Sequence, residues 1–329
     1  MAYDYLNKTG VGRLFTDIYS WLKENAGGKR AARLTIGTST NGWTKKDCDY
    51  LCDGTSDNTE INNAISALPS SGGEVVLLDG TYNLSLPITI GKGNVTFSGN
   101  GSGTKLVRAF AGSSSNNALI KVTAENCIVR NLSIDGVKAT YTSTSNNYGI
   151  NVYADNNTVE NCFVSNCASY GIYAPKSNCI IAKNRSTSNL YGIYVGGDHN
   201  TVTNNICLSN SNYGISVVYG DYNVIADNIV RLSGNRNISV YSSNSNVIKD
   251  NNCSVLSGDS VTPSEYSIIL QDSSSSNNIV VDNLVGTGTL RNNGTDNIAT
   301  TTPDITYGTT DLTAGSSKLE TGKLYFVYE

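Results

Sequence analysis

The first side chains that could do chemistry are acidic residues that recur at regular spacing. Asp227, Asp250 and Asp282 follow one another at steps of 23 and 32 residues, and each stands directly before an asparagine. Cleavage of a glycosidic bond uses two carboxyl groups about 5–9.5 Å apart. The three aspartates are therefore candidates for an acid and base pair. A solvated surface column, screened by nearby Lys249 or Arg231, explains the same spacing, and we favour it.

A second set consists of tyrosines. The tripeptide Tyr-Gly-Ile begins at residues 148, 170, 191 and 213, at steps of 22, 21 and 22. Stacked in space, these side chains could present flat rings and hydroxyl groups to a sugar. Structural stacking of the rings is the alternative that we favour. The candidate ligand-binding residues are Tyr148, Tyr170, Tyr173, Tyr191, Tyr194 and Tyr213, with Tyr153 and Tyr241 on the strands between them.

Other kinds of site have less support. His199 is the one histidine, and the eight cysteines include no CxxC pair, so we expect no metal and no cofactor, and we interpret the cysteines as buried thiols. A net charge of −4 and a pI near 5.1 argue against nucleic-acid binding. No apolar run reaches the roughly 18 residues of a membrane span, and the start does not resemble a signal peptide.

The tyrosines and aspartates belong to a repeat of roughly 22 residues. Each period carries short strands with alternating apolar and polar residues between corners rich in glycine and asparagine, which predicts β-coils rather than helix pairs. We expect a right-handed parallel β-helix of about ten coils. Stacked coils should align their asparagines into one ladder. The predicted ladder is Asn131, Asn161, Asn184, Asn205, Asn228, Asn251 and Asn283, and the column before it is Arg130, Glu160, Lys183, Asn204, Asp227, Asp250 and Asp282.

The repeat is interrupted twice and differs from both ends of the chain. Wide steps in the asparagine spacing predict loop insertions around 138–147 and 257–265. Near the N-terminus, an apolar stripe predicts a helix that docks or attaches, with Leu14, Phe15, Ile18 and Leu22 as its contacts. A second helix should start at an Asp57/Glu60 capping box and cover the open end of the β-helix. A final strand is expected over 323–328.

These elements divide the chain into four parts. Residues 1–30 form an N-terminal helical attachment segment, and residues 31–73 form a linker with the capping helix. The parallel β-helix occupies 74–298, and a small C-terminal β cap occupies 299–329.

Several segments resemble known families. Residues 53–68, which begin Asp53-Gly-Thr-Ser-Asp-Asn, and residues 71–84 resemble the opening of the pectate-lyase-like β-helix superfamily. The start, Asp4-Tyr-Leu-Asn-Lys-Thr-Gly-Val-Gly-Arg-Leu-Phe, and the end, from Asp311 to Glu329, resemble terminal segments of bacteriophage and prophage tail proteins of Gram-positive gut bacteria. That resemblance implies a virion protein assembled in the host cytoplasm, a homotrimer, N-terminal contact with other tail proteins, and a host cell-surface polysaccharide as partner.

Three hypotheses follow. The first is a non-enzymatic tail fibre or receptor-binding protein that recognises a cell-surface glycan. The second is a tailspike depolymerase that uses Asp227 and Asp250, with Asp282 beside them. The sequence lacks the paired aspartates of polygalacturonases and the calcium-ligand pattern of pectate lyases, so we favour the first. The third is a purely structural virion fibre or decoration protein.

Overall fold

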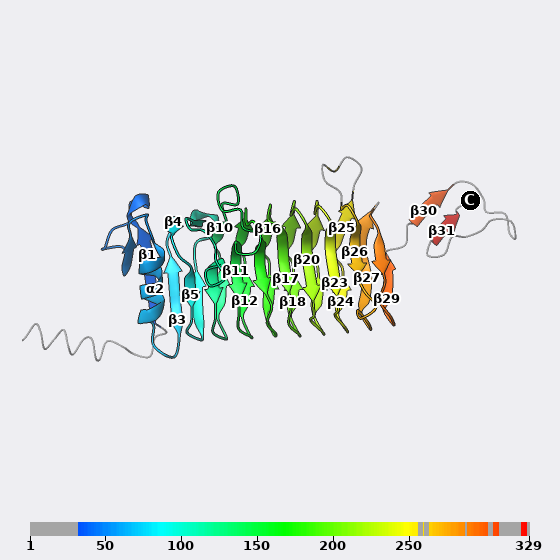
Figure 1. Cartoon of the computed structure of the whole chain (residues 1–329), viewed down its shortest axis with the longest axis horizontal. Helices are drawn as coiled ribbons and strands as arrows, with labels where there is room; N and C mark the ends of the chain where they lie inside the picture. Colours follow the sequence, from blue (N-terminus) through cyan, green and yellow to red (C-terminus); the bar gives the residue numbers. More distant parts are fainter. Residues whose placement is uncertain are drawn as a thin grey trace, which may run out of the picture.

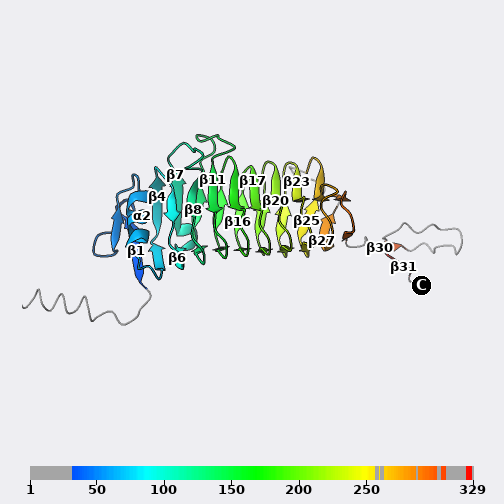
Figure 2. The same ribbon diagram turned by 60° about the horizontal axis from the view of Figure 1, so that its bottom comes forward.

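The computed structural model describes residues 32–255, 259, 263–286, 288–301, 305–308 and 324–327. The predicted attachment helix, with Leu14, Phe15, Ile18 and Leu22, lies outside these residues. The body of the molecule is a right-handed parallel β-helix, as predicted from the repeat. Successive coils lie side by side along one long axis, with α2 at one end (Figures 1 and 2).

The strands form three faces. The first face holds β1 (Arg33–Thr38), β3 (Gly73–Leu77), β6 (Val95–Ser98), β9 (Ile128–Arg130), β12 (Thr158–Glu160), β15 (Ile180–Ala182), β18 (Thr201–Thr203), β21 (Val224–Ala226), β24 (Val247–Lys249), β27 (Ile279–Gly286) and β29 (Ile298–Thr301), with β2 (Tyr50–Cys52) beside β1. The second face holds β4 (Gly80–Leu84), β7 (Thr104–Arg108), β10 (Ser133–Asp135), β13 (Phe163–Ser165), β16 (Arg185–Thr187), β19 (Ile206–Leu208), β22 (Ile229–Arg231) and β25 (Asn252–Val255).

The third face is a separate nine-stranded sheet. It consists of β5 (Ile88–Ile90), β8 (Ala118–Val122), β11 (Tyr148–Val152), β14 (Tyr170–Ala174), β17 (Tyr191–Val195), β20 (Tyr213–Val218), β23 (Arg236–Tyr241), β26 (Tyr266–Leu270) and β28 (Leu290–Asn292). A coil runs from the third face to the first, then to the second and back, as β17, β18, β19 and β20 do. Within the three faces, the strands of successive coils pair in parallel, which places equivalent residues about 4.8 Å apart.

The core is a set of stacked aliphatic columns. On the third face, Ile150, Ile172, Ile193, Ile215 and Ile238 pair in register and are fully buried. Burial of an isoleucine stabilises the fold by roughly 1.5–3 kcal/mol, so the core is a sum of similar contributions along the axis. No helix among the described residues is long and apolar enough to cross a membrane.

The helix α2 (Asn58–Ala67) covers one end of this core, as predicted, with Ile61, Ala64, Ile65 and Leu68 buried. The predicted capping box is wrong. Asp57 makes no side-chain bond to the helix; its carboxylate accepts the N–H groups of Gly54 and Asn83 instead. The stack also begins earlier than predicted, because β1 pairs with β3 within the segment that the sequence indicated as a linker. Short 3-10 turns occupy Ser39–Asn41 and Gly101–Gly103.

The asparagine ladder is confirmed in part. Buried Asn184, Asn205, Asn228, Asn251 and Asn283 bond one another through their amides, at 2.9–3.1 Å. Asn131 and Asn161 do not belong to the ladder. They have left-handed backbone at an outer corner, in the column of Lys183, Asn204 and Asp227. The prediction was therefore displaced by one residue in the first two coils, where Leu132 and Cys162 point inwards at the ladder position.

Two further ladders were not predicted. One runs along the corner after the third face, through Asn200, Asn223, Asn246, Asn278 and Asn297, and Cys179 separates it from Asn157, which accepts the N–H of Cys127. A shorter one joins Asn189 and Asn210 at the corner before the third face. The residue before the ladder position is left-handed in most coils, which asparagine tolerates well.

The predicted insertion at 138–147 is the loop between β10 and β11, whereas the one at 257–265 falls largely outside the described residues. The predicted last strand is confirmed as β31 (Leu324–Val327), which pairs in parallel with β30 (Ile305–Gly308) in its own sheet. All eight cysteines are free, in agreement with the prediction of thiols. Cys48 is only partly buried, and the other seven are buried.

Candidate functional site

The four Tyr-Gly-Ile tyrosines form one outward column on the third face, as predicted. Ring centroids are 5.1 Å apart from Tyr148 to Tyr170, 4.7 Å from Tyr170 to Tyr191 and 5.5 Å from Tyr191 to Tyr213. All four side chains are half-buried. The spacing follows directly from the stacking of coils, because each tyrosine begins an equivalent strand.

A second row lies beside the first. Tyr173 and Tyr194 stack at 4.6 Å, and Tyr173 also contacts Tyr170 at 4.9 Å and Tyr148 at 5.3 Å. The structure thus brings all six predicted ligand-binding tyrosines into one continuous surface, which we call the tyrosine face: Tyr148, Tyr170, Tyr173, Tyr191, Tyr194 and Tyr213.

Glycine follows the tyrosine in each Tyr-Gly-Ile tripeptide because a side chain at that position would point into the core. A Cβ at Gly171 would lie 2.2 Å from Ser186 Oγ, and one at Gly149 would lie 2.3 Å from Val164 Cγ1. Gly196 serves the second row in a different way, since a Cβ there would lie 2.8 Å from the ring of Tyr194. The glycines therefore leave room for both rows of rings on one sheet.

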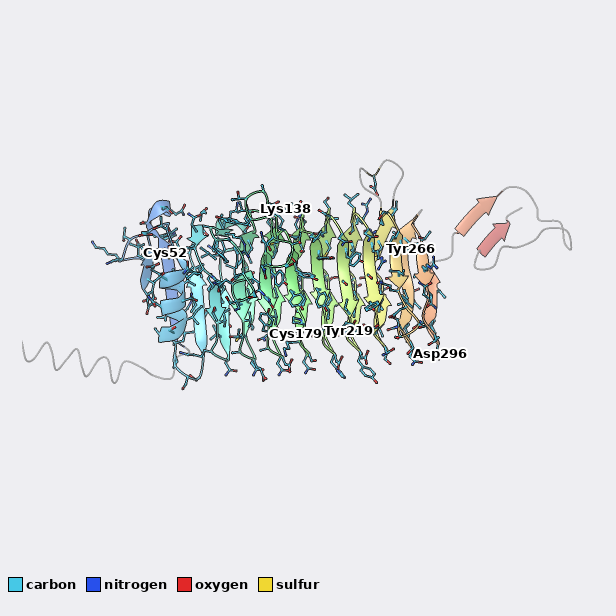
Figure 3. All side chains as sticks on the ribbon, viewed as in Figure 1. Cys52, Lys138, Cys179, Tyr219, Tyr266 and Asp296 are labelled. Carbon is cyan, nitrogen blue, oxygen red and sulfur yellow. The ribbon has the colours of Figure 1, made fainter. Side chains whose placement is uncertain are left out.

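A second aromatic group lies at the corner after the third face. Tyr219 and Tyr241 are 5.5 Å apart, and His199 stacks with Tyr222 at 5.2 Å. We call these four residues the Tyr219 corner. Tyr219 is 65% exposed and Tyr222 is 59% exposed, so their rings are much more open than those of the tyrosine face. In Figure 3, Tyr219 and Cys179 lie near one edge of the body and Lys138 lies near the other.

Sequence reasoning missed Tyr219 and Tyr222. Both have left-handed backbone, with φ of 58° and 57°, which is uncommon for a bulky residue. The positions equivalent to Tyr222 in other coils carry Asn178, Ser245 and Asn277, and the position equivalent to Tyr219 in the next coil carries Ser242. An aromatic residue at a position that suits asparagine is the signal that could have found them, and such local strain is often associated with function.

The hydroxyl groups of Tyr148, Tyr170, Tyr173 and Tyr194 remain protonated at neutral pH. Burial raises the pKa of Tyr148 to about 12, and burial followed by the nearby Tyr173 and Tyr219 raises the pKa of Tyr194 to about 12. Burial also raises the pKa of Tyr170 and Tyr173. The face consequently offers neutral rings and hydroxyl groups that donate or accept hydrogen bonds, a surface suited to polar uncharged groups such as sugar hydroxyls.

The aspartates first considered for catalysis lie elsewhere. Asp227, Asp250 and Asp282 are exposed and occupy adjacent coils at the corner between the first and second faces, so the predicted column is confirmed for these three. Asp250 pairs with Lys249 at 3.2 Å, with both side chains nearly half exposed. Arg130 and Glu160 are not in this column. They lie opposite each other in the neighbouring column, one residue earlier in each coil, together with Ala182. These features fit a solvated surface column.

A second acidic group holds coils together. The carboxylate of Asp155 accepts the N–H of Ser177, that of Asp198 accepts the N–H of Asp221, and that of Asp221 accepts the N–H of Asn244. Each bond joins one coil to the next. These carboxylates therefore have a structural use at the corner that carries Tyr219 and Tyr222.

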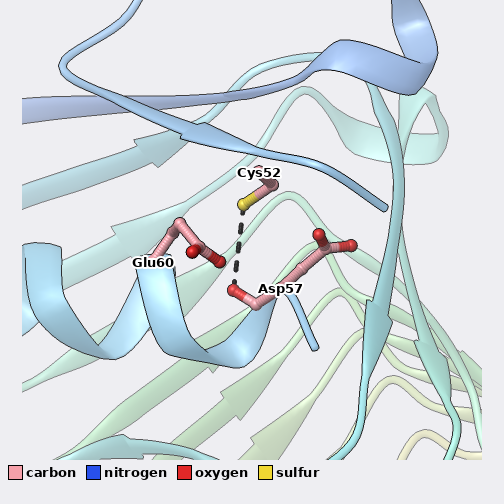
Figure 4. A group of neighbouring side chains, drawn as sticks. All are labelled: Cys52, Asp57 and Glu60. Atoms are coloured by element: carbon pink, nitrogen blue, oxygen red, sulfur yellow. Dashed lines mark hydrogen bonds between the residues drawn. The ribbon is translucent and has the colours of Figure 1, made fainter. Parts of the chain in front are cut away.

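Cys52, Asp57 and Glu60 place ligand-type atoms within 4.8 Å of one another (Figure 4). The thiol donates to the backbone oxygen of Asp57, and the carboxylate of Asp57 accepts two backbone N–H groups. Burial raises the pKa of both Cys52 and Asp57. A protonated thiol and an already bonded carboxylate fit a structural junction beneath α2 better than a metal site.

The comparisons with known proteins agree with the fold. The model of the right-handed beta helix region matches residues 148–306, just under half of the chain. ORF18 of Geobacillus virus E2 is similar in structure, with a TM-score of 0.50 and 16% identity over 91% of this chain and 65% of that chain. No curated protein matches the sequence.

Two further solved structures are similar. The enzymatically active domain of tailspike protein 2 of bacteriophage CBA120 has a TM-score of 0.53 and 12% identity, over 85% of this chain and 48% of that one. DFA-IIIase of Arthrobacter chlorophenolicus A6, in complex with DFA-III, has a TM-score of 0.56 and 14% identity, over 75% and 66%. The chain thus spans about two thirds of ORF18 and about half of the tailspike domain. At these identities the likeness establishes the fold, and the fold is a right-handed parallel β-helix.

Proposed function

We propose that this chain is a bacteriophage or prophage tail fibre or receptor-binding virion protein that binds a host cell-surface polysaccharide through the tyrosine face and the Tyr219 corner. The observation that carries the proposal is the tyrosine face, in which six tyrosines are in ring contact across four coils. Tyr219 and Tyr222 add open rings at the corner that follows the same sheet.

The chemistry of this surface suits sugars. Tyrosine offers a large rigid ring and a hydroxyl group at a small cost in side-chain entropy. Because the coils repeat every 4.8 Å or so, the surface offers the same groups again along the axis. Such a periodic surface fits an extended polymer better than a compact ligand.

The virion role has separate support. The terminal segments resemble those of phage tail proteins, and the fold is shared with ORF18 of Geobacillus virus E2 and with the CBA120 tailspike domain. We propose that the N-terminal segment attaches the protein to other tail proteins, and that the chain forms homotrimers.

Side-by-side association has one supporting feature in the body. Five large exposed apolar side chains lie in the two strand columns that flank the corner of Asp227, interspersed with polar residues such as Arg185 and Asn252. Exposed apolar surface of this kind can serve protein association when it forms a contiguous patch. We call this set the apolar edge: Phe163, Ile180, Ile229, Ile279 and Leu284.

The test is incubation of the purified protein with envelope polysaccharide from candidate hosts, followed by measurement of cosedimentation and of reducing ends. Binding without release of reducing ends supports the receptor-binding function. Release that disappears in Asp227→Asn or Asp250→Asn would instead establish a depolymerase. Absence of both signals on every host envelope would leave a structural fibre and overturn the proposal.

A further inference from the structure

A pocket lies beside the tyrosine face, at the corner that leads into the third sheet. Its volume is about 220 Å³, and it is lined by Lys138, Thr142, Cys167, Ala168, Leu190 and Ser211. We call it the Lys138 pocket. Leu190 directly precedes Tyr191, while Ala168 and Ser211 stand two residues before Tyr170 and Tyr213. The pocket therefore borders the first row of rings over three consecutive coils.

The loop between β10 and β11 is built to hold Lys138 in place. The backbone N–H of Lys138 donates to Asn166 O at 2.8 Å. Fully buried Asn147 donates to the carbonyl groups of Gly136 at 3.0 Å and Tyr141 at 2.6 Å, which closes the loop on itself. The ammonium group donates to Ser188 O, fifty residues away in sequence. Lysine is thus fixed across neighbouring coils, and one of its three N–H groups is used.

The charges around the pocket are unbalanced. Behind Cys167 lies Arg108, which is 2% exposed; its Nη2 donates to two backbone carbonyls, and its Nε and Nη1 have no hydrogen-bond partner among the described residues. The thiol of Cys167, whose pKa burial raises to about 12, is influenced by Arg108, Asp135 and Lys138. Asp135 is already paired with Lys105 at 2.9 Å. Arg108 and Lys138 therefore both act on the Cys167 thiol, while the one carboxylate that acts on it, that of Asp135, is already paired with Lys105.

The lining itself adds no negative charge. None of the six lining residues is acidic, and no carboxylate in the described parts of the chain lies within ion-pair distance of Lys138. Thr142 and Ser211 supply hydroxyl groups, and Ala168 and Leu190 supply apolar walls. Apolar walls lower the local dielectric and strengthen an ionic contact.

We propose that the Lys138 pocket binds an anionic group, a carboxylate or a phosphate, carried by the polysaccharide that lies on the tyrosine face. The inference rests on the proposed function and adds the chemical class of the ligand to it. Lys138 supplies the charge and two further N–H groups, while Thr142 and Ser211 donate hydroxyl bonds. The neighbouring rings hold the uncharged part of the polymer.

The experiment compares three probes with the full chain: polygalacturonate as a carboxylated polymer, glycerol phosphate teichoic acid as a phosphorylated one, and dextran as a neutral one. Affinity is measured at low and at high salt. At least one of the two anionic polymers should bind at least about tenfold more tightly than dextran and should lose that advantage in high salt. The polymer that binds more tightly identifies carboxylate or phosphate as the group. Equal affinity for dextran and for both anionic polymers would overturn the inference.

Variants separate charge from folding. Lys138→Gln should weaken binding of the anionic polymer about tenfold, and Lys138→Arg, which keeps the charge, should restore most of it. Lys92→Gln is the matched control, because Lys92 also donates to backbone carbonyls, those of Ser66 and Leu68, beneath α2 and away from the pocket. Unchanged binding in Lys138→Gln would refute the inference.

The two proposals fail in different ways. If Tyr219→Ala abolishes binding and Lys138→Gln leaves it unchanged, the polysaccharide-binding function stands and the anionic pocket does not. If the wild-type protein binds no envelope polymer, both are overturned.

Discussion

Replacement of Asn228 by alanine tests the reasoning about the ladder most sharply. Asn228 is buried, and its Oδ1 accepts two hydrogen bonds from Asn205, one from the backbone N–H at 2.9 Å and one from the side-chain Nδ2–H at 3.0 Å. Its Nδ2 donates to Val202 O at 2.9 Å and to Asn251 Oδ1 at 2.9 Å. Alanine removes all four hydrogen bonds and leaves the N–H of Asn205 and the carbonyl of Val202 buried without these partners.

A net loss of about 1 kcal/mol for each bond gives a fall of about 4 kcal/mol in the free energy of unfolding. The assay is urea unfolding followed by circular dichroism, with hydrogen exchange to locate the opened coils. The matched control is Asp227→Asn, at the exposed left-handed position next to Asn228, which should change stability by less than about 0.5 kcal/mol. A loss below about 1 kcal/mol in Asn228→Ala would show that the ladder does not stabilise the stack as we describe.

Four further outcomes are expected. Tyr219→Ala should weaken polysaccharide binding at least about fivefold with little change in stability, measured by cosedimentation and thermal unfolding, because its ring is open. Gly171→Val should destabilise the fold by about 1–3 kcal/mol or more in urea unfolding, since its Cβ would meet Ser186. Burial opposes ionisation of Asp135, but hydrogen bonds, led by that from Lys105, outweigh it and hold the pKa of Asp135 below the usual range. The ionised carboxylate therefore stabilises the fold above about pH 4, and this stabilisation is lost as the pH falls. Asp135→Asn should reduce the dependence of the free energy of unfolding on pH in this acidic range, measured by urea unfolding at several pH values. Ile229→Asp should dissociate the proposed trimer in light scattering, and a trimer that persists would exclude the apolar edge as its interface.

The repeat could be predicted because both the recurring motif and the apolar pattern of the strands are visible in the sequence. Tyr-Gly-Ile recurs at nearly constant spacing, and inward isoleucines fill the same strands, so pattern and packing agree. The helix α2, which covers the end of the core, could also be predicted, because its apolar residues have helical spacing and it directly precedes the first strongly apolar strands.

The register of the asparagine ladder was harder to predict from the sequence. Asn131 and Asn161 are asparagines at left-handed corners, where the residue type suits the backbone, whereas Leu132 and Cys162 occupy the inward position beside them. Adjacent corner and ladder positions both favour asparagine, so residue identity alone does not distinguish them. The ladder at the corner after the third face was missed for the same reason.

The candidate site was predicted only in part. The two tyrosine rows follow from the spacing, but the close approach of the Tyr194 ring to Gly196 is not revealed by any periodicity. The Lys138 pocket depends on contacts between residues fifty positions apart, made by a loop that interrupts the repeat.

The measurement that tests the central claim most directly is cosedimentation of the protein with envelope polysaccharide from candidate host cells, for the wild type and for Tyr170→Ala/Tyr219→Ala. Leu86→Ala, which removes an exposed apolar side chain between β4 and β5, away from the tyrosines and from the apolar edge, is the control. The account predicts that the wild type and Leu86→Ala bind alike and that the double variant loses at least about tenfold in affinity. Equal binding by all three proteins would contradict it, because the aromatic surface would then have no part in recognition.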